Sequence, residues 1–364
     1  MIKRIYIKLL AYLDQLLGLL HFYLEKYNFT ELIVFQEVNK KNDVIQISNS
    51  YPINYKEKDK ILFDEWKTYL TFENKLFFLF NVNVSYKGII SIGINCFVPA
   101  LPHPVFKNNY GIRFNLHQNI FKKVVKFSDK EHYFIVHDMW SYANYYHWLV
   151  DSLTRLIFWF DELPKYSLLI AQDAPKYIKE TICLFPFKKI TEIPNNTYCH
   201  IPNLCVPNFT AWPGQQHPIT LKKTKNFLLS HFNLNENKIE RIYVSRAKQS
   251  RRKIANEELV LNLLKSYDFQ IVFFEGMSIS EQIGIVRNAK LMITSHGANV
   301  TNAMFMQNGK LLELIRIVNP NFCYWSMLTN LDIPYYYQLC ELVNHDDLFV
   351  DIIELEKNIQ ALIK

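Results

Sequence analysis

A histidine, an aspartate and an arginine recur at intervals of four residues in the stretch NYYHWLVDSLTRLIFWF, which spans positions 144 to 160. This spacing predicts a helix with His147, Asp151 and Arg155 on one face. A carboxylate beside an imidazole orients the ring and raises its basicity, which suits a general base that deprotonates a hydroxyl. The same spacing is also typical of a structural stripe in which Asp151 only pairs with Arg155.

A second group of residues could bind an anion. The short apolar run Leu291 to Thr294 predicts a buried strand, the residues Ser295-His296-Gly297-Ala298-Asn299 follow it, and Asn299 to Met306 predicts the next helix. A helix start offers free N–H groups, glycine allows close approach of the backbone, and His296 could donate to a phosphate oxygen. We interpret this turn, with Asn302, as the seat of a nucleotide diphosphate. The alternative is an ordinary turn with a core histidine.

An arginine ends another expected strand. Arg246 follows Arg241 to Val244, and the run RAKQSRRK that it opens also contains Arg251. Because the planar guanidinium suits phosphate, an arginine at the carboxyl end of a parallel strand predicts a second contact to the same diphosphate. Arg251 could equally be an ordinary surface charge.

Glu313 interrupts the apolar strand LLELI. A carboxylate in such a strand is costly unless it is paired, so it predicts a specific partner. A ribose diol is one candidate, and a salt bridge to Arg316 or Lys310 is the other.

Composition excludes several classes of protein. The chain has 364 residues, 49% hydrophobic and 15% aromatic content, and a net charge of +7, which argue against disorder and against a surface that coats nucleic acid. The six cysteines show no CxxC pair, and DxD, HExxH and GxSxG motifs are missing. The sequence therefore gives no support for a metal site or a serine hydrolase.

The pattern of apolar segments predicts four regions. Residues 1–27 read as an amphipathic helix, which either packs on its own domain or lies on a membrane surface. Residues 28–232 read as one domain, irregular and β-rich at first and α/β from about residue 130. Residues 233–345 alternate strand and helix like a doubly wound parallel sheet, and 346–364 predict a final helix.

Several of these pieces together resemble glycosyltransferase family 61. They are NYYHWLVDSLTRL (144–156), YVSR with RRKIANE (243–257), SEQ (280–282), SHGANVTNAMF (295–305) and LLELI (311–315). The resemblance covers about half of the chain. It implies a GT-B-like architecture, in which two Rossmann-like domains face a cleft and the C-terminal one binds a nucleotide sugar.

The resemblance also implies roles for individual residues. His147 or Asp151 would be the catalytic base. The donor would be bound by Arg246, Arg251, Ser295, His296, Gly297, Ala298, Asn299, Asn302 and Glu313. The acceptor would be bound by Asn144, Tyr146 and Arg155.

We therefore expect a metal-independent, inverting glycosyltransferase without a cofactor, with a UDP-sugar as the expected donor. The expected acceptor is a glycan or glycolipid of a surface polysaccharide or lipooligosaccharide, as in bacterial capsular and lipopolysaccharide enzymes. The expected location is the cytoplasm, with contact to the inner face of the membrane, and nucleic acid is not an expected partner. The competing hypothesis is a non-catalytic nucleotide- or sugar-binding scaffold of a polysaccharide assembly complex.

Overall fold

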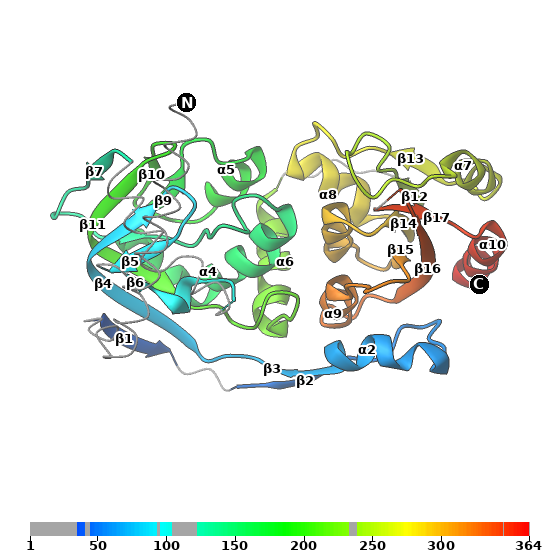
Figure 1. Cartoon of the computed structure of the whole chain (residues 1–364), viewed down its shortest axis with the longest axis horizontal. Helices are drawn as coiled ribbons and strands as arrows, with labels where there is room; N and C mark the ends of the chain where they lie inside the picture. The colour runs from blue at the N-terminus through cyan, green and yellow to red at the C-terminus, as the bar shows by residue number, and fades with distance from the viewer. Residues whose placement is uncertain are drawn as a thin grey trace, which may run out of the picture.

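The fold is that of a computed structural model, which describes residues 35–40, 44–92, 95–103, 122–232, 239–344 and 346–363. The expected helix at 1–27 and the expected domain break at 233–238 lie outside these residues. The described chain is a mixed α/β protein in which two large sheets are separated by helices (Figure 1).

The first sheet has the order β10-β9-β8-β11-β4-β5-β6, with β1 also pairing with β4 and β7 with β11. Its strands β8, β9, β10 and β11 run parallel, whereas β4 runs antiparallel to β11. The strands are β1 (Phe35–Lys40), β4 (Asn74–Ser85), β5 (Ile90–Ile92), β6 (Asn95–Cys96), β7 (Val124–Lys126), β8 (Tyr133–Phe134), β9 (Ser167–Ala171), β10 (Lys189–Ile193) and β11 (Tyr198–Pro207).

The second sheet has the order β13-β12-β14-β15-β16-β17 and is parallel except for β17. The strands are β12 (Arg241–Val244), β13 (Gln270–Val272), β14 (Leu291–Ser295), β15 (Lys310–Arg316), β16 (Tyr335–Val343) and β17 (Asp347–Phe349). The chain therefore changes direction across the sheet between β12 and β14. In doubly wound sheets, ligands bind outside the carboxyl ends of the strands at such a switch point.

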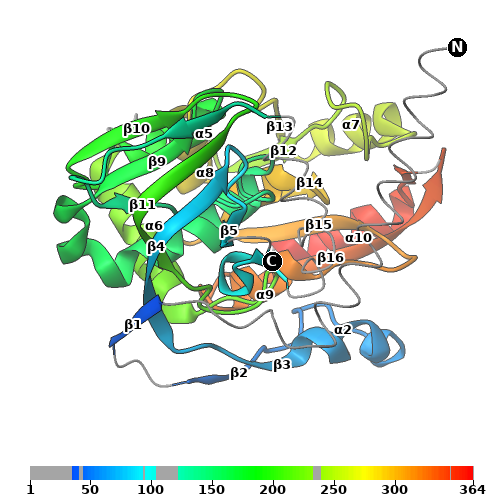
Figure 2. The ribbon, with the colours of Figure 1, turned by 60° about the vertical axis from the view of Figure 1, so that its left-hand side comes forward.

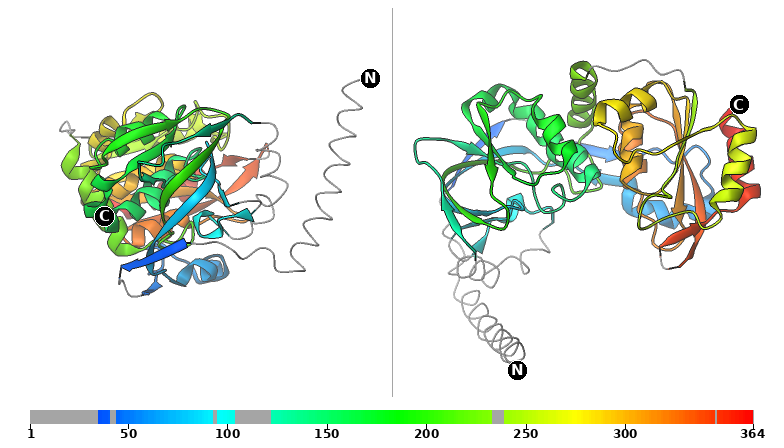
Figure 3. Two further views of the ribbon diagram at one scale, coloured as in Figure 1. Left: turned by 90° about the vertical axis from the view of Figure 1, so that its left-hand side faces the viewer. Right: turned by 90° about the horizontal axis from the view of Figure 1, so that it is seen from above.

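Helices from both halves fill the space between the sheets. They are η4 (His147–Ser152), α4 (Leu153–Leu156), η5 (Ile157–Lys165), α5 (Lys176–Ile182), α6 (Pro218–His231), α8 (Ile279–Arg287), η6 (Ala298–Phe305) and α9 (Cys323–Thr329). Figures 1 and 3 show α5, α6 and α8 between the two sheets. One apolar cluster runs through them and includes Trp148, Ile178, Ile283, Val300 and Trp325. The far face of the second sheet is covered by α7 (Glu257–Ser266) and α10 (Ile352–Ile363).

An early segment of the chain lies on the second sheet, although it belongs to the region predicted as the N-terminal domain. It contains β2 (Gln46–Ser48), η1 (Glu57–Asp59), α2 (Lys60–Lys67) and β3 (Thr68–Leu70) (Figure 2). Phe63 is fully buried, and its ring stacks on Phe322 at 4.2 Å between centroids and meets Trp325 edge-on at 4.9 Å. Residues 28–232 thus contribute to both halves of the molecule.

Candidate active site

The candidate base lies on the first turns after β8. Asn144 caps this helix, since its Oδ1 accepts from the Tyr146 N–H at 2.9 Å. The helix then continues with π geometry through η4, a form that is frequent at functional sites. Within η4, His147 Nδ1 lies 2.6 Å from Asp151 Oδ2. Of the two pairings that the sequence left open for Asp151, the structure has the one with His147.

Burial and charge shift the pKa of each member of this pair in opposite directions. Burial lowers the pKa of His147, but the hydrogen bond and charge of Asp151 outweigh it, so that the pKa is raised above its ordinary value of 6.5. Burial also raises the pKa of Asp151, against the effect of His147. The Nδ1–H donates to the carboxylate, so Nε2 is the basic nitrogen of the neutral ring. Nε2 has no hydrogen-bond partner among the described residues, and 22% of the side chain is exposed.

Arg155 is part of the core. Its side chain is 2% exposed and donates to the carbonyl oxygens of Val136 and Pro207 and to Asp138 Oδ2, the last at 3.3 Å. Its guanidinium also covers the ring of Phe209 at 4.1 Å. A guanidinium that is surrounded by protein in this way anchors the helix, and the expected role of Arg155 in acceptor binding stays an untested prediction.

Tyr146 is also buried and so does not present a free surface to an acceptor. Its hydroxyl accepts from Gln216 Nε2 at 2.6 Å, and its ring meets Tyr324 at 5.2 Å. Asn144 is exposed and lies at the start of the helix. Of the three residues expected to bind the acceptor, Asn144 alone lies at the surface.

Arg246 lies against the turn that follows β14. It is 9% exposed, and Nη2 donates to the Arg251 carbonyl oxygen at 3.4 Å. Its buried Nε has no partner among the described residues. A Cβ atom on Gly297 would collide with this guanidinium, so only glycine allows the two to lie so close. Register places Val244 beside Thr294, which explains why the residues after β12 and β14 meet.

His296 is oriented by a buried carboxylate. Its Nδ1 lies 2.5 Å from Glu313 Oε1, and the Tyr335 hydroxyl donates to Glu313 Oε2 at 2.7 Å. Glu313 is fully buried and bonds neither Lys310 nor Arg316, the two partners that the sequence suggested. Both carboxylate oxygens are hydrogen-bonded inside the protein, one to the imidazole of His296, and the expected contact of Glu313 with a ribose stays a prediction.

The other expected donor residues divide into two groups. Ser295 and Asn302 are buried and bond within the protein, Ser295 to the Arg252 carbonyl oxygen and Asn302 to Tyr145 and Gln282. Ala298 and Asn299 are half-buried at the start of η6, and Asn299 Nδ2 is buried without a partner among the described residues. Arg251 is exposed.

Tyr324, at the second position of α9, joins the two groups of candidate residues. Its ring lies 5.2 Å from that of Tyr146 and 5.2 Å from that of His296. Burial and the nearby charge of Glu313 are among the causes that raise its pKa well above its ordinary value. Sequence reasoning missed this residue, since α9 carries no recognisable motif and its position beside the site depends on long-range packing.

Two hollows adjoin this centre. The larger, of about 300 Å³, has walls from both halves, among them Tyr145, Tyr177, Phe274, Glu275 and Asn299. The smaller, of about 70 Å³, is lined by Arg252, His296, Arg316, Asn321, Asp346 and Leu348.

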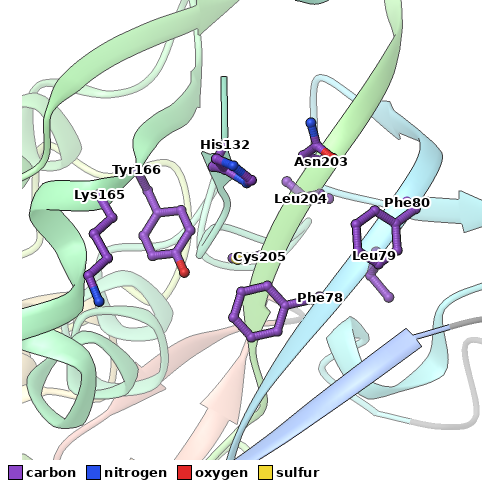
Figure 4. Close-up of a pocket in the computed structure, with 9 residues that line it drawn as sticks. All are labelled: Phe78, Leu79, Phe80, His132, Lys165, Tyr166, Asn203, Leu204 and Cys205. Atoms are coloured by element: carbon purple, nitrogen blue, oxygen red, sulfur yellow. The ribbon is translucent and has the colours of Figure 1, made fainter. Parts of the chain in front are cut away.

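A third hollow lies away from the candidate site. Figure 4 shows it beside the paired strands β4 and β11, with Phe78, Leu79 and Phe80 of β4 on one side and Lys165 and Tyr166 on the other. Its volume is about 410 Å³, and none of the candidate catalytic or donor residues lines it. We assign no role to it.

Two features are missing from the described part of the chain. Among these residues, no group of three or more histidine, cysteine, aspartate or glutamate side chains is arranged to hold a metal ion. No helix in the described part of the chain is long and apolar enough to cross a membrane.

Comparison with known proteins identifies the region that contains this centre. Residues 145–312 match the family model of Glycosyltransferase 61. A stretch of 92 residues is 34% identical to the EGF domain-specific O-linked N-acetylglucosamine transferase of Drosophila melanogaster. It covers 24% of this chain and 18% of that protein, so the present chain matches less than a fifth of its relative. Both findings support a relationship between this region and glycosyltransferase family 61.

Proposed function

We propose that the protein transfers a sugar from a nucleotide-sugar donor to a hydroxyl group by a single displacement. The observation that carries the proposal is the position of Tyr324, whose ring adjoins the base-bearing helix on one side and His296 on the other. It supports a common centre for the His147–Asp151 pair and the anion-binding turn. The two-domain GT-B arrangement is part of this proposal, and the two sheets separated by helices support it.

The donor's diphosphate would lie at the start of η6. Free N–H groups at a helix start and the guanidinium of an arginine stabilise anions. The buried Nε of Arg246 has no hydrogen-bond acceptor among the described residues. His296 would face the diphosphate with Nε2, because Nδ1 faces Glu313, and as an imidazolium it would donate from Nε2 to a phosphate oxygen. These groups can take up the charge of the leaving nucleotide without a metal ion, a contribution of several kcal/mol in enzymes of this kind.

The chemical step would use His147 as the base. Nε2 accepts the proton of the acceptor hydroxyl while its oxygen forms a bond to the anomeric carbon. The bond from that carbon to the diphosphate oxygen breaks, and the nucleoside diphosphate leaves with the electron pair. Attack opposite the leaving group inverts the configuration. Asp151 holds the ring and stabilises the imidazolium that forms.

Fewer observations support the proposed acceptor and the proposed location. The ring of Trp140 lies 4.9 Å from that of His147, and an aromatic ring beside the base is a suitable platform for an acceptor sugar. We propose a glycan or glycolipid of a bacterial surface polysaccharide or lipooligosaccharide. The Drosophila relative is named an O-linked transferase, which supports an oxygen nucleophile.

We propose the cytoplasm, including the inner face of the membrane, as the location of the protein. The cysteines are free, which fits this compartment.

Release of nucleoside diphosphate tests the proposal. Wild-type protein is incubated with UDP-, GDP- and ADP-sugars and a mixture of oligosaccharide acceptors, and the released nucleoside diphosphate is measured. We expect acceptor-dependent release with at least one donor and a loss of about 10²- to 10⁴-fold in His147→Ala. The matched control is His231→Ala, since His231 is exposed on α6. Release that is equal in wild type and His147→Ala would refute the assignment of the base.

A further inference from the structure

The larger hollow beside η6 is lined by two residues that each carry a buried polar atom without a hydrogen-bond partner among the described residues. Glu275 accepts from Gln249 through Oε1, but its buried Oε2 has no such partner. The same holds for Nδ2 of Asn299. An unpaired buried polar atom costs about 1–3 kcal/mol, so a pair of them around one cavity indicates a ligand that supplies a donor and an acceptor.

Three other residues that line this hollow are aromatic and could hold a flat ring. Phe274 is buried, and Tyr145 and Tyr177 meet edge-to-face at 5.4 Å between ring centroids. All of them line the cavity, whose volume is about 300 Å³. Aromatic walls with a few convergent polar groups are typical of pockets for small planar ligands. A nucleobase offers a flat face together with ring N–H or amino donors and carbonyl or ring-nitrogen acceptors.

The position of the cavity indicates that it holds the nucleoside of the donor and not the transferred sugar. Ala298 and Asn299, at the start of η6, form one wall, so a group bonded to a diphosphate at that helix start reaches the cavity. Neither His147 nor Asp151 lines it. The reacting carbon must meet the base, so the part of the donor that does not react is the part that fits here.

We propose that this cavity is the nucleobase subsite of the donor, with Glu275 Oε2 accepting from an N–H of the base and Asn299 Nδ2 donating to an acceptor atom of its edge. The inference rests on the proposed function. It makes Glu275, on the loop after β13, a residue that determines which nucleotide is bound.

A comparison of a nucleotide with inorganic pyrophosphate tests the subsite. Affinities of UDP, GDP, CDP, ADP, the corresponding nucleotide sugars and pyrophosphate are measured by calorimetry for wild type, Glu275→Ala and Asn299→Ala. We expect the variant to lose about tenfold or more in affinity for the preferred nucleotide, since one hydrogen bond to a charged group is removed. Its affinity for pyrophosphate should stay equal or rise, because a negative charge that acts on Arg246 is lost. Glu258→Gln, an exposed position on α7, is the matched control and should change neither value.

The other outcomes are distinguishable. An unchanged nucleotide affinity in both Glu275→Ala and Asn299→Ala would overturn the subsite while leaving the proposed function intact. So would a loss confined to intact nucleotide sugars, which would place the sugar in the cavity. If wild type binds pyrophosphate but prefers no nucleotide over it, both the subsite and the proposed donor fail.

Discussion

At the scale of residues, the same pairing of a histidine with a buried carboxylate occurs twice. His147 and His296 each place Nδ1 against a buried carboxylate, at 2.6 Å from Asp151 and 2.5 Å from Glu313. In both cases the carboxylate fixes the ring and leaves Nε2 as the working nitrogen. We propose that the first ring removes a proton and that the second donates to a phosphate.

The raised pKa of His147 predicts a pH profile. The base must be neutral, so kcat/KM should fall as the pH drops through the raised pKa, above the ordinary 6.5. Asp151 and Asp138 are the charges that raise this pKa, with Asp151 also hydrogen-bonded. In Asp151→Asn the acidic limb should therefore move to lower pH, with a reduced maximal rate. A pH-rate profile of both proteins checks this, and a limb that stays in place would exclude His147 as the group that titrates.

The contact between Gly297 and Arg246 makes a second prediction. A methyl group in Gly297→Ala would displace the guanidinium, so nucleotide affinity should fall about tenfold or more, as expected for the loss of a charge-assisted hydrogen bond. Calorimetry with the preferred nucleoside diphosphate measures the change, and circular dichroism verifies the fold. If the variant is folded and binds as well as wild type, Arg246 is not a diphosphate contact.

At the scale of elements, the helix after β8 is fixed to the first sheet by Arg155. Since removal of one partner from a buried ion pair leaves the other charge uncompensated, Arg155→Met should lower the free energy of unfolding by about 3–5 kcal/mol. Urea denaturation measures this value, and Lys179→Met on the surface of α5 is the control. A stable Arg155→Met protein with weakened acceptor binding would restore the role that the sequence suggested.

Local patterns predicted most elements of the second sheet. The strand expected at 241–244 is confirmed, and the strand expected at 291–294 ends one residue later. The expected helix at 144–160 is present, but it changes from π to α to 3₁₀ geometry, which periodicity does not reveal. The helices α2 and α9 were missed, because their apolar residues are matched to partners far away in the chain.

The same limit applies to the candidate site. The four-residue spacing predicted that His147 lies beside Asp151, because it matches the period of a helix. The positions of the expected strand ends predicted that Arg246 lies near Gly297, because the carboxyl ends of parallel strands meet at one edge of a sheet. The partners of Glu313 and Arg155 could not be predicted, since both depend on which buried groups the tertiary fold brings within hydrogen-bond distance.

At the scale of the whole molecule, the segment 44–70 links the two halves. It packs on α9, which carries Tyr324, and then continues into β4 of the first sheet. Phe63→Ala should therefore destabilise the protein by about 3–5 kcal/mol and also reduce turnover, because α9 loses its support. Thermal unfolding and a transfer assay measure both effects. Ile61→Ala, 79% exposed on the same helix, should change neither, and a variant Phe63→Ala with wild-type stability would refute this coupling.

The central claim is that the turn after β14 and Arg246 bind a nucleoside diphosphate without a metal ion. The most direct measurement is the melting temperature of wild type and Arg246→Ala with UDP, GDP, CDP or ADP, each with and without EDTA. We predict that at least one nucleotide raises the melting temperature of wild type, that EDTA leaves this shift unchanged, and that Arg246→Ala abolishes it. The absence of a shift with every nucleotide at millimolar concentration, or a shift that EDTA removes, would contradict the claim.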